Sequence, residues 1–312
     1  MTIEHRTINA NGISFHVAAT TGRTGPPILC LHGFPEGWMS FRPVMERLPD
    51  RPIHAPDLRG YPGSTAAEPY DVFTLTDDVH ALIGALGLDR PVLVAHDWGG
   101  AIGWWFAHRY SSAIRKLVVV NCTHPRTLVR AVCRVQDLQP FRIPWVPFFE
   151  LPRIPEWLLT SSLGRRCLRF TFLIREGRAG AMDRSLVDEL VARFQSPADF
   201  HPPINYYREM VATVLWPARR RRLYVLYDTP ITVPVTVVWG VKDGALPLRV
   251  ASGSGDDAGC EIEWRLLPGV GHFVDLEAAD ELAQEIARAA DTAPTPATAR
   301  APAMPDTVTA GR

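Results

Sequence analysis

Short apolar runs alternate with amphipathic stretches from residue 13 to about residue 122. The apolar runs have the length and continuity of buried strands, and the stretches between them repeat apolar side chains at helical spacing. This alternation is typical of an α/β fold with a mostly parallel sheet and helices on both of its faces. The strands are predicted at residues 13–19, 27–31, 52–56, 91–97 and 114–120, and the helices at 37–48, 75–86 and 101–110.

The alternation breaks after residue 125 and resumes at residue 233. The intervening chain is rich in proline and aromatic residues and contains several helix-like pieces. Two further strands, at 233–240 and 261–267, and a helix at 276–290 then complete the pattern. We therefore predict an α/β core of residues 1–125 and 231–292, a helical cap inserted over residues 126–230, and a disordered Ala-, Pro- and Thr-rich tail over residues 293–312.

The segment His96-Asp97-Trp98-Gly99-Gly100 joins a predicted buried strand to a predicted helix. A sharp strand-to-helix turn with small residues around one reactive side chain is the form of a nucleophile elbow, which usually carries serine. Aspartate at this point favours attack on a saturated carbon that bears a leaving group, because the product is an enzyme-bound ester. The simpler interpretation of Asp97 is a helix N-cap.

Asp243 and His272 complete a candidate triad with Asp97. Asp243 closely follows the predicted strand 233–240, and His272 lies between the last strand and the last helix. The order nucleophile, acid, histidine is the one found in the α/β-hydrolase fold. In such a triad His272 is the base that activates water, and Asp243 fixes its tautomer and stabilises the imidazolium.

The turn His32-Gly33-Phe34-Pro35 follows the predicted strand 27–31 and supplies backbone donors. Its small residues let N–H groups point into a site. The N–H groups of Phe34 and Trp98 are predicted to form an oxyanion hole for a tetrahedral intermediate. His32 itself is expected to brace the loop.

These motifs resemble those of the α/β-hydrolases in the epoxide hydrolase and haloalkane dehalogenase group. The similar segments are residues 32–38, 57–61, 96–100 and 121–125, so the resemblance covers the core almost end to end. It implies an α/β-hydrolase fold with an inserted helical cap, and chemistry that needs no metal and no cofactor. Pro62 departs from the glycine common in the group, and we expect only a local difference in that loop.

Two cap positions decide between the two activities. An opening epoxide needs an acidic O–H donor, whereas a departing halide needs only N–H donors. Residues 204–209 resemble the cap motif that carries a donor tyrosine, so Tyr207 is the predicted proton donor and Tyr206 is structural. Residues 144–152 resemble the segment that carries a second tyrosine, but that position holds Trp145, whose indole donates a hydrogen bond and no proton.

The resemblance therefore implies an epoxide hydrolase that converts an apolar epoxide into a vicinal diol through an ester of Asp97, which water activated by His272 hydrolyses. A haloalkane dehalogenase with the same triad, with Trp145 and Trp98 cradling the halide, is the alternative. A catalytically silent binding protein is the third possibility. The cap aromatics expected to line an apolar substrate pocket are Trp145, Phe148, Phe149, Trp157, Phe170 and Phe172.

The composition of the chain excludes several classes of partner and site. The chain has 312 residues and a formal net charge of zero, so neither nucleic acid nor a membrane is expected as a partner. The run 219–222, four arginines, is expected to be a solvated face. The five cysteines are scattered without a Cys-x-x-Cys pair, so no disulfide framework and no zinc site is predicted. We expect a cytoplasmic enzyme, monomeric or homodimeric, whose partner is a small apolar epoxide.

Overall fold

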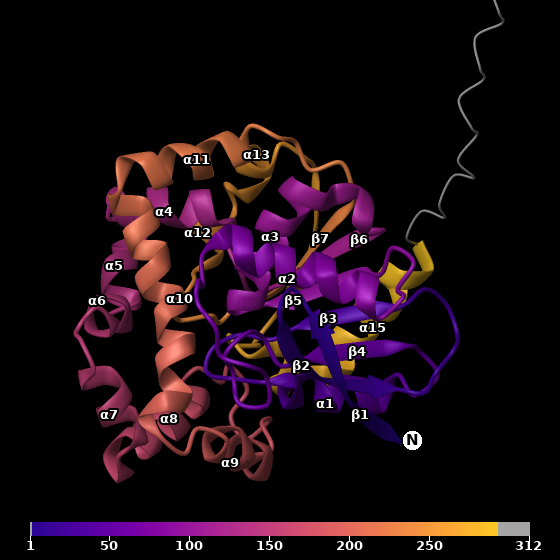
Figure 1. The fold of residues 1–312 in the computed structure, drawn as a ribbon, viewed down its shortest axis with the longest axis horizontal. Coiled ribbons are helices and arrows are strands. Elements are labelled where there is room, and N and C mark those ends of the chain that lie inside the picture. Colours follow the sequence, from indigo (N-terminus) through magenta and orange to yellow (C-terminus); the bar gives the residue numbers. More distant parts are fainter. Residues whose placement is uncertain (1, 293–312) are drawn as a thin grey trace, which may run out of the picture.

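The computed structural model describes residues 2–292, in which eight strands form one sheet in the order β1-β2-β4-β3-β5-β6-β7-β8 (Figure 1). From β4 onward in this order, neighbouring strands are parallel, while β1 and β2 pair antiparallel at one edge. The predicted α/β-hydrolase fold with a mostly parallel sheet is confirmed. The strands are β1 Ile3–Ala10, β2 Ile13–Thr20, β3 Ile28–Leu31, β4 Ile53–Pro56, β5 Val92–His96, β6 Lys116–Val120, β7 Val235–Gly240 and β8 Ile262–Leu267.

Helices cover both faces of the sheet because successive side chains of a strand point to opposite faces. In β5, Val92 and Val94 belong to the apolar cluster shared with α1 and α15, whereas Leu93 and Ala95 belong to the cluster shared with α2 and α3. The helices of this part are α1 Arg42–Arg47, α2 Val72–Ala85, α3 Asp97–Tyr110, α12 Leu248–Ala251, α13 Ser254–Ala258, α14 Val274–Glu277 and α15 Ala279–Thr292.

Between β6 and β7 the described chain is helical and forms no strand. We call this part, α4 to α11, the helical excursion. Figure 1 shows its helices together beside the sheet, with the long α10 running past the core. Its helices are α4 Pro125–Cys133, α5 Gln139–Arg142, α6 Trp145–Phe149, α7 Ile154–Thr160, α8 Ser162–Ile174, α9 Arg184–Ala192, α10 Pro197–Leu215 and α11 Pro217–Tyr227.

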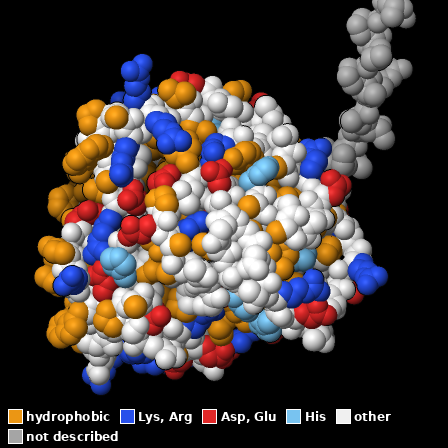
Figure 2. Space-filling model, in the orientation of Figure 1, with side chains coloured by type: hydrophobic (Ala, Val, Ile, Leu, Met, Phe, Trp, Pro, Cys, Tyr) orange, Lys and Arg blue, Asp and Glu red, His pale blue; other side chains and the backbone are white. Residues whose placement is uncertain are grey.

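Large hydrophobic side chains are exposed on the outside of the helical excursion, where Figure 2 shows them gathered at the left edge. Trp157 is 67% exposed and Phe170 is 61% exposed. Neither lines the cavity described below, so their prediction as pocket residues was wrong. Phe172 is buried instead against Phe273, with ring centroids 4.5 Å apart. Within residues 2–292, no helix is both long enough and apolar enough to cross a membrane.

Several boundaries differ from the sequence prediction. Strand β1 was missed because its side chains are mostly solvent-facing at the sheet edge, so they show no apolar run. The predicted helix 37–48 is a short 3-10 helix, Trp38–Phe41, followed by α1. The arginines 219–222 lie exposed on α11 as expected, and all five cysteines are free. The predicted tail, 293–312, lies outside the described residues.

A buried ion pair ties the loop after β4 to α2. Asp78 accepts hydrogen bonds from Arg59 Nε and Nη2, each at 2.6 Å, and both side chains are almost fully buried. The carbonyl of Arg59 in turn accepts from the Tyr206 hydroxyl at 2.8 Å, which connects α10 to the same loop. The pair therefore holds both the core loop and the helical excursion in place.

Asp78→Ala should lower the free energy of unfolding by about 3–5 kcal/mol, because it leaves the Arg59 guanidinium buried without its counter-ion. Urea denaturation followed by circular dichroism measures this. Asp89→Ala is the matched control, since it breaks the exposed pair with Arg115 and should cost less than about 1 kcal/mol. Equal losses in the two variants would contradict the assignment.

Candidate active site

Asp97 lies at the junction of β5 and α3 with a φ of 46°. This is a left-handed backbone conformation that residues other than glycine rarely adopt. The neighbouring chain makes room for this turn. A Cβ atom on Gly99 would lie 2.3 Å from the carbonyl oxygen of Leu31, and one on Gly33 would lie 2.5 Å from the Cβ of Asp97. The strained junction presents the Asp97 carboxylate at the carboxyl edge of the sheet, which is the geometry of a nucleophile elbow.

The backbone N–H of Phe34 donates to Asp97 Oδ1 at 2.9 Å. This donor therefore already faces the oxygen that would carry negative charge in a tetrahedral intermediate at the Asp97 carboxyl carbon. His32 supports the turn: its Nε2 accepts from the N–H of Leu58 at 3.0 Å, so its Nδ1 donates to the carbonyl of Gly33 at 2.9 Å. The N–H of Trp98, the second predicted donor, lies in the first turn of α3 and stays a prediction in that role.

Asp243 and His272 lie together at the carboxyl ends of β7 and β8. His272 Nδ1 donates to Asp243 Oδ2 at 2.7 Å, while His272 Nε2 lies 3.6 Å from Asp97 Oδ2. Asp243 Oδ1 accepts from the N–H groups of Ala245 and Leu246 at 2.8 and 2.9 Å. The structure thus brings the three predicted triad residues into one chain of contacts, with the imidazole between the two carboxylates.

The carboxylates and the imidazole of this triad each favour the charged form of their neighbour. Burial alone would raise the pKa of Asp97, but the neighbouring His272 and the Phe34 N–H hold that pKa at about 2. Burial alone would lower the pKa of His272, but the two carboxylates, Asp243 first, raise it to about 9. Near neutral pH the site therefore holds an ionised Asp97 beside a protonated His272.

Tyr207 projects from α10 toward Asp97 and is buried. Its ring packs edge-on against those of Trp98, Phe149 and Phe34, with centroids 4.9, 5.0 and 5.4 Å away. Burial and then Asp97 raise its pKa well above 10, and hydrogen bonding from the indoles of Trp98 and Trp145 offsets part of that rise. Tyr206 faces the other way, into the core, as its expected structural role requires.

A cavity of about 400 Å³ lies beside Asp97 and His272. Its lining is mainly apolar and comes from α3 and from the helices of the excursion, so it suits an apolar substrate. The three predicted pocket residues of α6, namely Trp145, Phe148 and Phe149, all line it.

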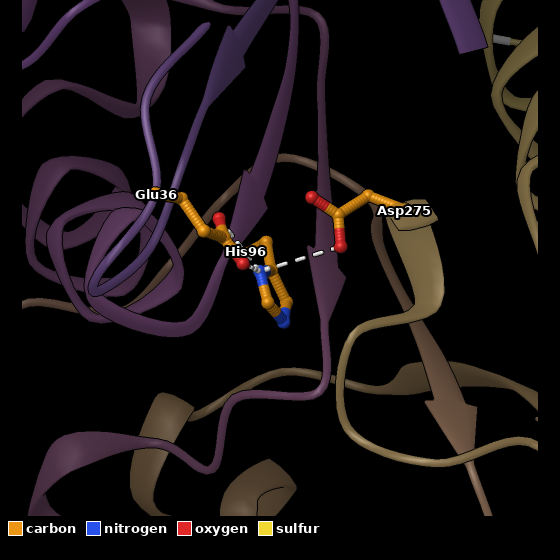
Figure 3. A group of neighbouring side chains, drawn as sticks. All are labelled: Glu36, His96 and Asp275. Carbon is orange, nitrogen blue, oxygen red and sulfur yellow. Dashed lines mark hydrogen bonds and ion pairs between the residues drawn. The ribbon is translucent and has the colours of Figure 1, made fainter. Parts of the chain in front are cut away.

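Next to Asp97, Glu36, His96 and Asp275 form a fully buried cluster (Figure 3). His96 Nδ1 lies 3.0 Å from Glu36 Oε1 and 3.7 Å from Asp275 Oδ1, and its Nε2 donates to the carbonyl of His272 at 3.1 Å. Despite burial, the two carboxylates raise the pKa of His96 to about 10. His96 therefore connects Glu36, through Nδ1, with the loop that carries His272, through Nε2.

Two positioning residues were missed from the sequence. Asn121, with a φ of 40°, donates from Nδ2 to Asp243 Oδ2 at 2.8 Å and accepts from the N–H of Gly240 at 2.7 Å. Glu277 accepts from the N–H groups of Gly271 and Gly177 at 2.8 and 3.0 Å. Asn121 lies in a segment already noted for its resemblance, directly after a buried strand, which was a usable signal. Glu277 gave none, because its partners are backbone groups, and Gly177 lies a hundred residues away in sequence.

Comparison with known proteins agrees with this geometry. Residues 26–279 match the family model described as the alpha/beta hydrolase fold. Epoxide hydrolase 3 of Mus musculus is 30% identical over 282 residues, which cover 89% of this chain and 74% of that protein. The AB hydrolase superfamily protein YfhM of Bacillus subtilis is 30% identical over 255 residues, which cover 78% and 83%. The crystal structure of an epoxide hydrolase from Vigna radiata is 27% identical, covers 92% of this chain and 97% of its own, and has a TM-score of 0.75.

The raised pKa of His272 predicts a pH-dependent contribution to stability. A folded state that binds the proton more tightly is stabilised fully below the ordinary pKa near 6.5, and it loses this stabilisation as pH rises through about 9. The unfolding free energy of the wild type, relative to His272→Gln, should therefore fall by on the order of 1–3 kcal/mol between pH 6 and pH 9.5.

Urea denaturation at a series of pH values measures that difference. His80→Gln replaces an exposed histidine of α2 and should follow the wild type. Parallel pH curves for the wild type and His272→Gln would show that the proton on His272 does not stabilise the fold.

Proposed function

Because this chain belongs to the α/β-hydrolase family, and within it to the epoxide hydrolase group, we propose that it opens an epoxide to a vicinal diol through a covalent ester of Asp97. One observation carries the proposal. The two oxygens of Asp97 have different surroundings, with Oδ1 on the N–H of Phe34 and Oδ2 facing His272. This arrangement leaves one oxygen for attack and keeps the other in position to become the ester carbonyl.

In the first step Asp97 Oδ2 forms a bond to an epoxide carbon while the carbon–oxygen bond of the ring breaks. The electron pair of that bond goes to the epoxide oxygen, which takes the proton of Tyr207. The indole N–H groups of Trp98 and Trp145 then stabilise the Tyr207 oxygen as it gains charge. Trp145 thus supports the proton donor and does not replace a second tyrosine.

In the second step His272 removes a proton from water, and the water oxygen adds to the ester carbon of Asp97. Formation of the ester has by then removed the Asp97 charge that helped to raise the pKa of His272, so the imidazole releases its proton to solvent and becomes a base. The oxyanion lies on the N–H of Phe34. Collapse releases the diol, protonated by His272, and the regenerated Asp97, whose pKa is about 2, returns the remaining proton to Tyr207. After the turnover the restored Asp97 charge lets the imidazole take up a proton from solvent again.

The helical excursion acts as the cap in this proposal, since it supplies Tyr207 and most of the apolar cavity wall. We propose a core of residues 1–125 and 231–292 and a cap of residues 126–230. We propose an apolar epoxide as the substrate because the cavity lining is mainly hydrocarbon.

A haloalkane dehalogenase stays the second candidate, because Trp98 and Trp145 are two indoles near the nucleophile. Against it, the buried Tyr207 supplies the O–H donor that an opening epoxide needs and a departing halide does not. Assays of styrene oxide for diol and of bromoalkanes for halide separate the two activities. Inactivity toward both with the triad intact would favour the silent binding protein.

His272→Gln should trap the alkyl ester, because alkylation needs only Asp97 and Tyr207 while hydrolysis needs the base. Mass spectrometry of the peptide that contains Asp97 should show an increase equal to the mass of the epoxide. Asp97→Ala should lose at least about 10³-fold in kcat and show no adduct. A His272→Gln enzyme that turns over without any adduct would rule out the covalent route.

Tyr207→Phe should slow formation of the ester by about 10²–10⁴-fold, because the opening oxygen loses its general acid. Single-turnover measurements of tryptophan fluorescence follow this step. The neighbouring Tyr206→Phe is the control, since it removes only the hydroxyl that binds the carbonyl of Arg59. It should cost about 1 kcal/mol of stability and leave ester formation within a few-fold of the wild type. Equal rates in the two variants would exclude Tyr207 as the acid.

A further inference from the structure

Arg175 is a cation in the wall of an otherwise mainly apolar cavity. It follows α8 directly, and its guanidinium lies over the ring of Trp145, 4.7 Å from the centroid. It lines the same cavity as Asp97 and His272 and is only half-buried, so a molecule in the cavity can reach it. None of the catalytic steps proposed above uses this side chain.

Within the described chain, no carboxylate forms a hydrogen bond or an ion pair with the guanidinium of Arg175. The nearby carboxylates already have other donors: Asp243 binds His272 and Asn121, and Asp97 binds the N–H of Phe34. Burial lowers the pKa of Arg175, although the side chain stays a cation. A half-buried arginine without a counter-ion is costly to keep in apolar surroundings, so it is expected to serve a ligand.

The backbone of Arg175 contacts the loop that carries Gly271 and His272. Its carbonyl accepts from the N–H of His272 at 3.2 Å, and a Cβ atom on Gly271 would lie 1.8 Å from that carbonyl oxygen. Glu277 joins the same two segments, because its carboxylate accepts from the N–H groups of Gly177 and Gly271. The backbone that carries the cation is therefore held at a set place relative to His272, and the ring of Trp145 lies against the guanidinium.

We propose that Arg175 binds a carboxylate on the substrate, so that the enzyme prefers epoxides that carry an acid group on an apolar frame. This inference rests on the proposed function and names its substrate class. The planar guanidinium matches a carboxylate with two parallel hydrogen bonds, and Trp145 covers one face while the N–H edges stay available. One positive charge suits a monoanion. Without Arg175, Asp97 and Asp243 would repel an incoming carboxylate.

The test compares an epoxy acid with its primary amide, which has nearly the same shape and no charge. Two such pairs, 3-phenylglycidate and 10,11-epoxyundecanoate with their amides, cover a short and a long spacer. For at least one pair the wild type should favour the acid in kcat/KM by about 10-fold or more. Arg175→Gln should reduce that acid-to-amide ratio by about 10–100-fold.

Two variants control for structural effects. Arg175→Lys keeps the charge and loses the planar fork, so it should restore part of the preference for the acid. Arg166→Gln removes a charge from the exposed face of the same helix and should leave the ratio at the wild-type value. If acid and amide fall together in Arg175→Gln, or if the wild type shows no preference for either acid, the proposal is overturned.

A binding experiment separates this inference from the proposed function. Calorimetric titration with decanoate and decanamide needs no turnover. The wild type should bind decanoate at least about 10-fold more tightly than decanamide, and Arg175→Gln should lose this difference. If no epoxide is hydrolysed but decanoate is still preferred, the proposed function fails and the anion site stands. If epoxides are hydrolysed and decanoate is not preferred, the anion site fails alone.

Discussion

The negative charge of Asp97 is the constraint on which the rest of the site depends. It helps to raise the pKa of His272, and it raises those of Tyr207 and of the buried thiol of Cys122. In the proposed chemistry one event, formation of the ester, removes that charge. That change lowers the pKa of Tyr207 as its proton moves to the epoxide oxygen, and it lowers the pKa of His272, which then becomes the base.

Several separate parts of the fold hold the Asp97 carboxylate in its position. The left-handed turn at Asp97 requires close passage of Gly99 beneath the end of β3, and the turn after β3 brings the N–H of Phe34 to the carboxylate. Behind it, the His96 imidazolium connects the buried Glu36 with the carbonyl of His272. Local strain at one residue is thus maintained by neighbours from three separate segments of sequence.

The features that depend on short stretches of sequence could be predicted from the sequence. Asp97 and Asp243 follow the buried strands β5 and β7, and His272 follows the last parallel strand, β8. Parallel strands place such positions at one edge of the sheet, so their meeting could be anticipated. Strand β1 was not anticipated because an exposed edge strand needs no apolar run. Trp157 and Phe170 were misplaced because an aromatic residue on a short helix does not reveal which side of that helix faces solvent. Arg175 and Glu277 were missed because their roles come from contacts between segments about a hundred residues apart.

The hydrogen bond between the carbonyl of Arg175 and the N–H of His272 has a consequence for chimeric enzymes. The N–H of His272 donates to the backbone carbonyl of Arg175, which belongs to the helical excursion. Two of the N–H groups that donate to Glu277, those of Gly177 and Arg178, belong to it as well. An exchange of the whole excursion between homologues would therefore replace part of the scaffold of His272 together with most of the cavity wall. Grafts that retain residues 175–178 would keep the core intact while the remaining helices diverge.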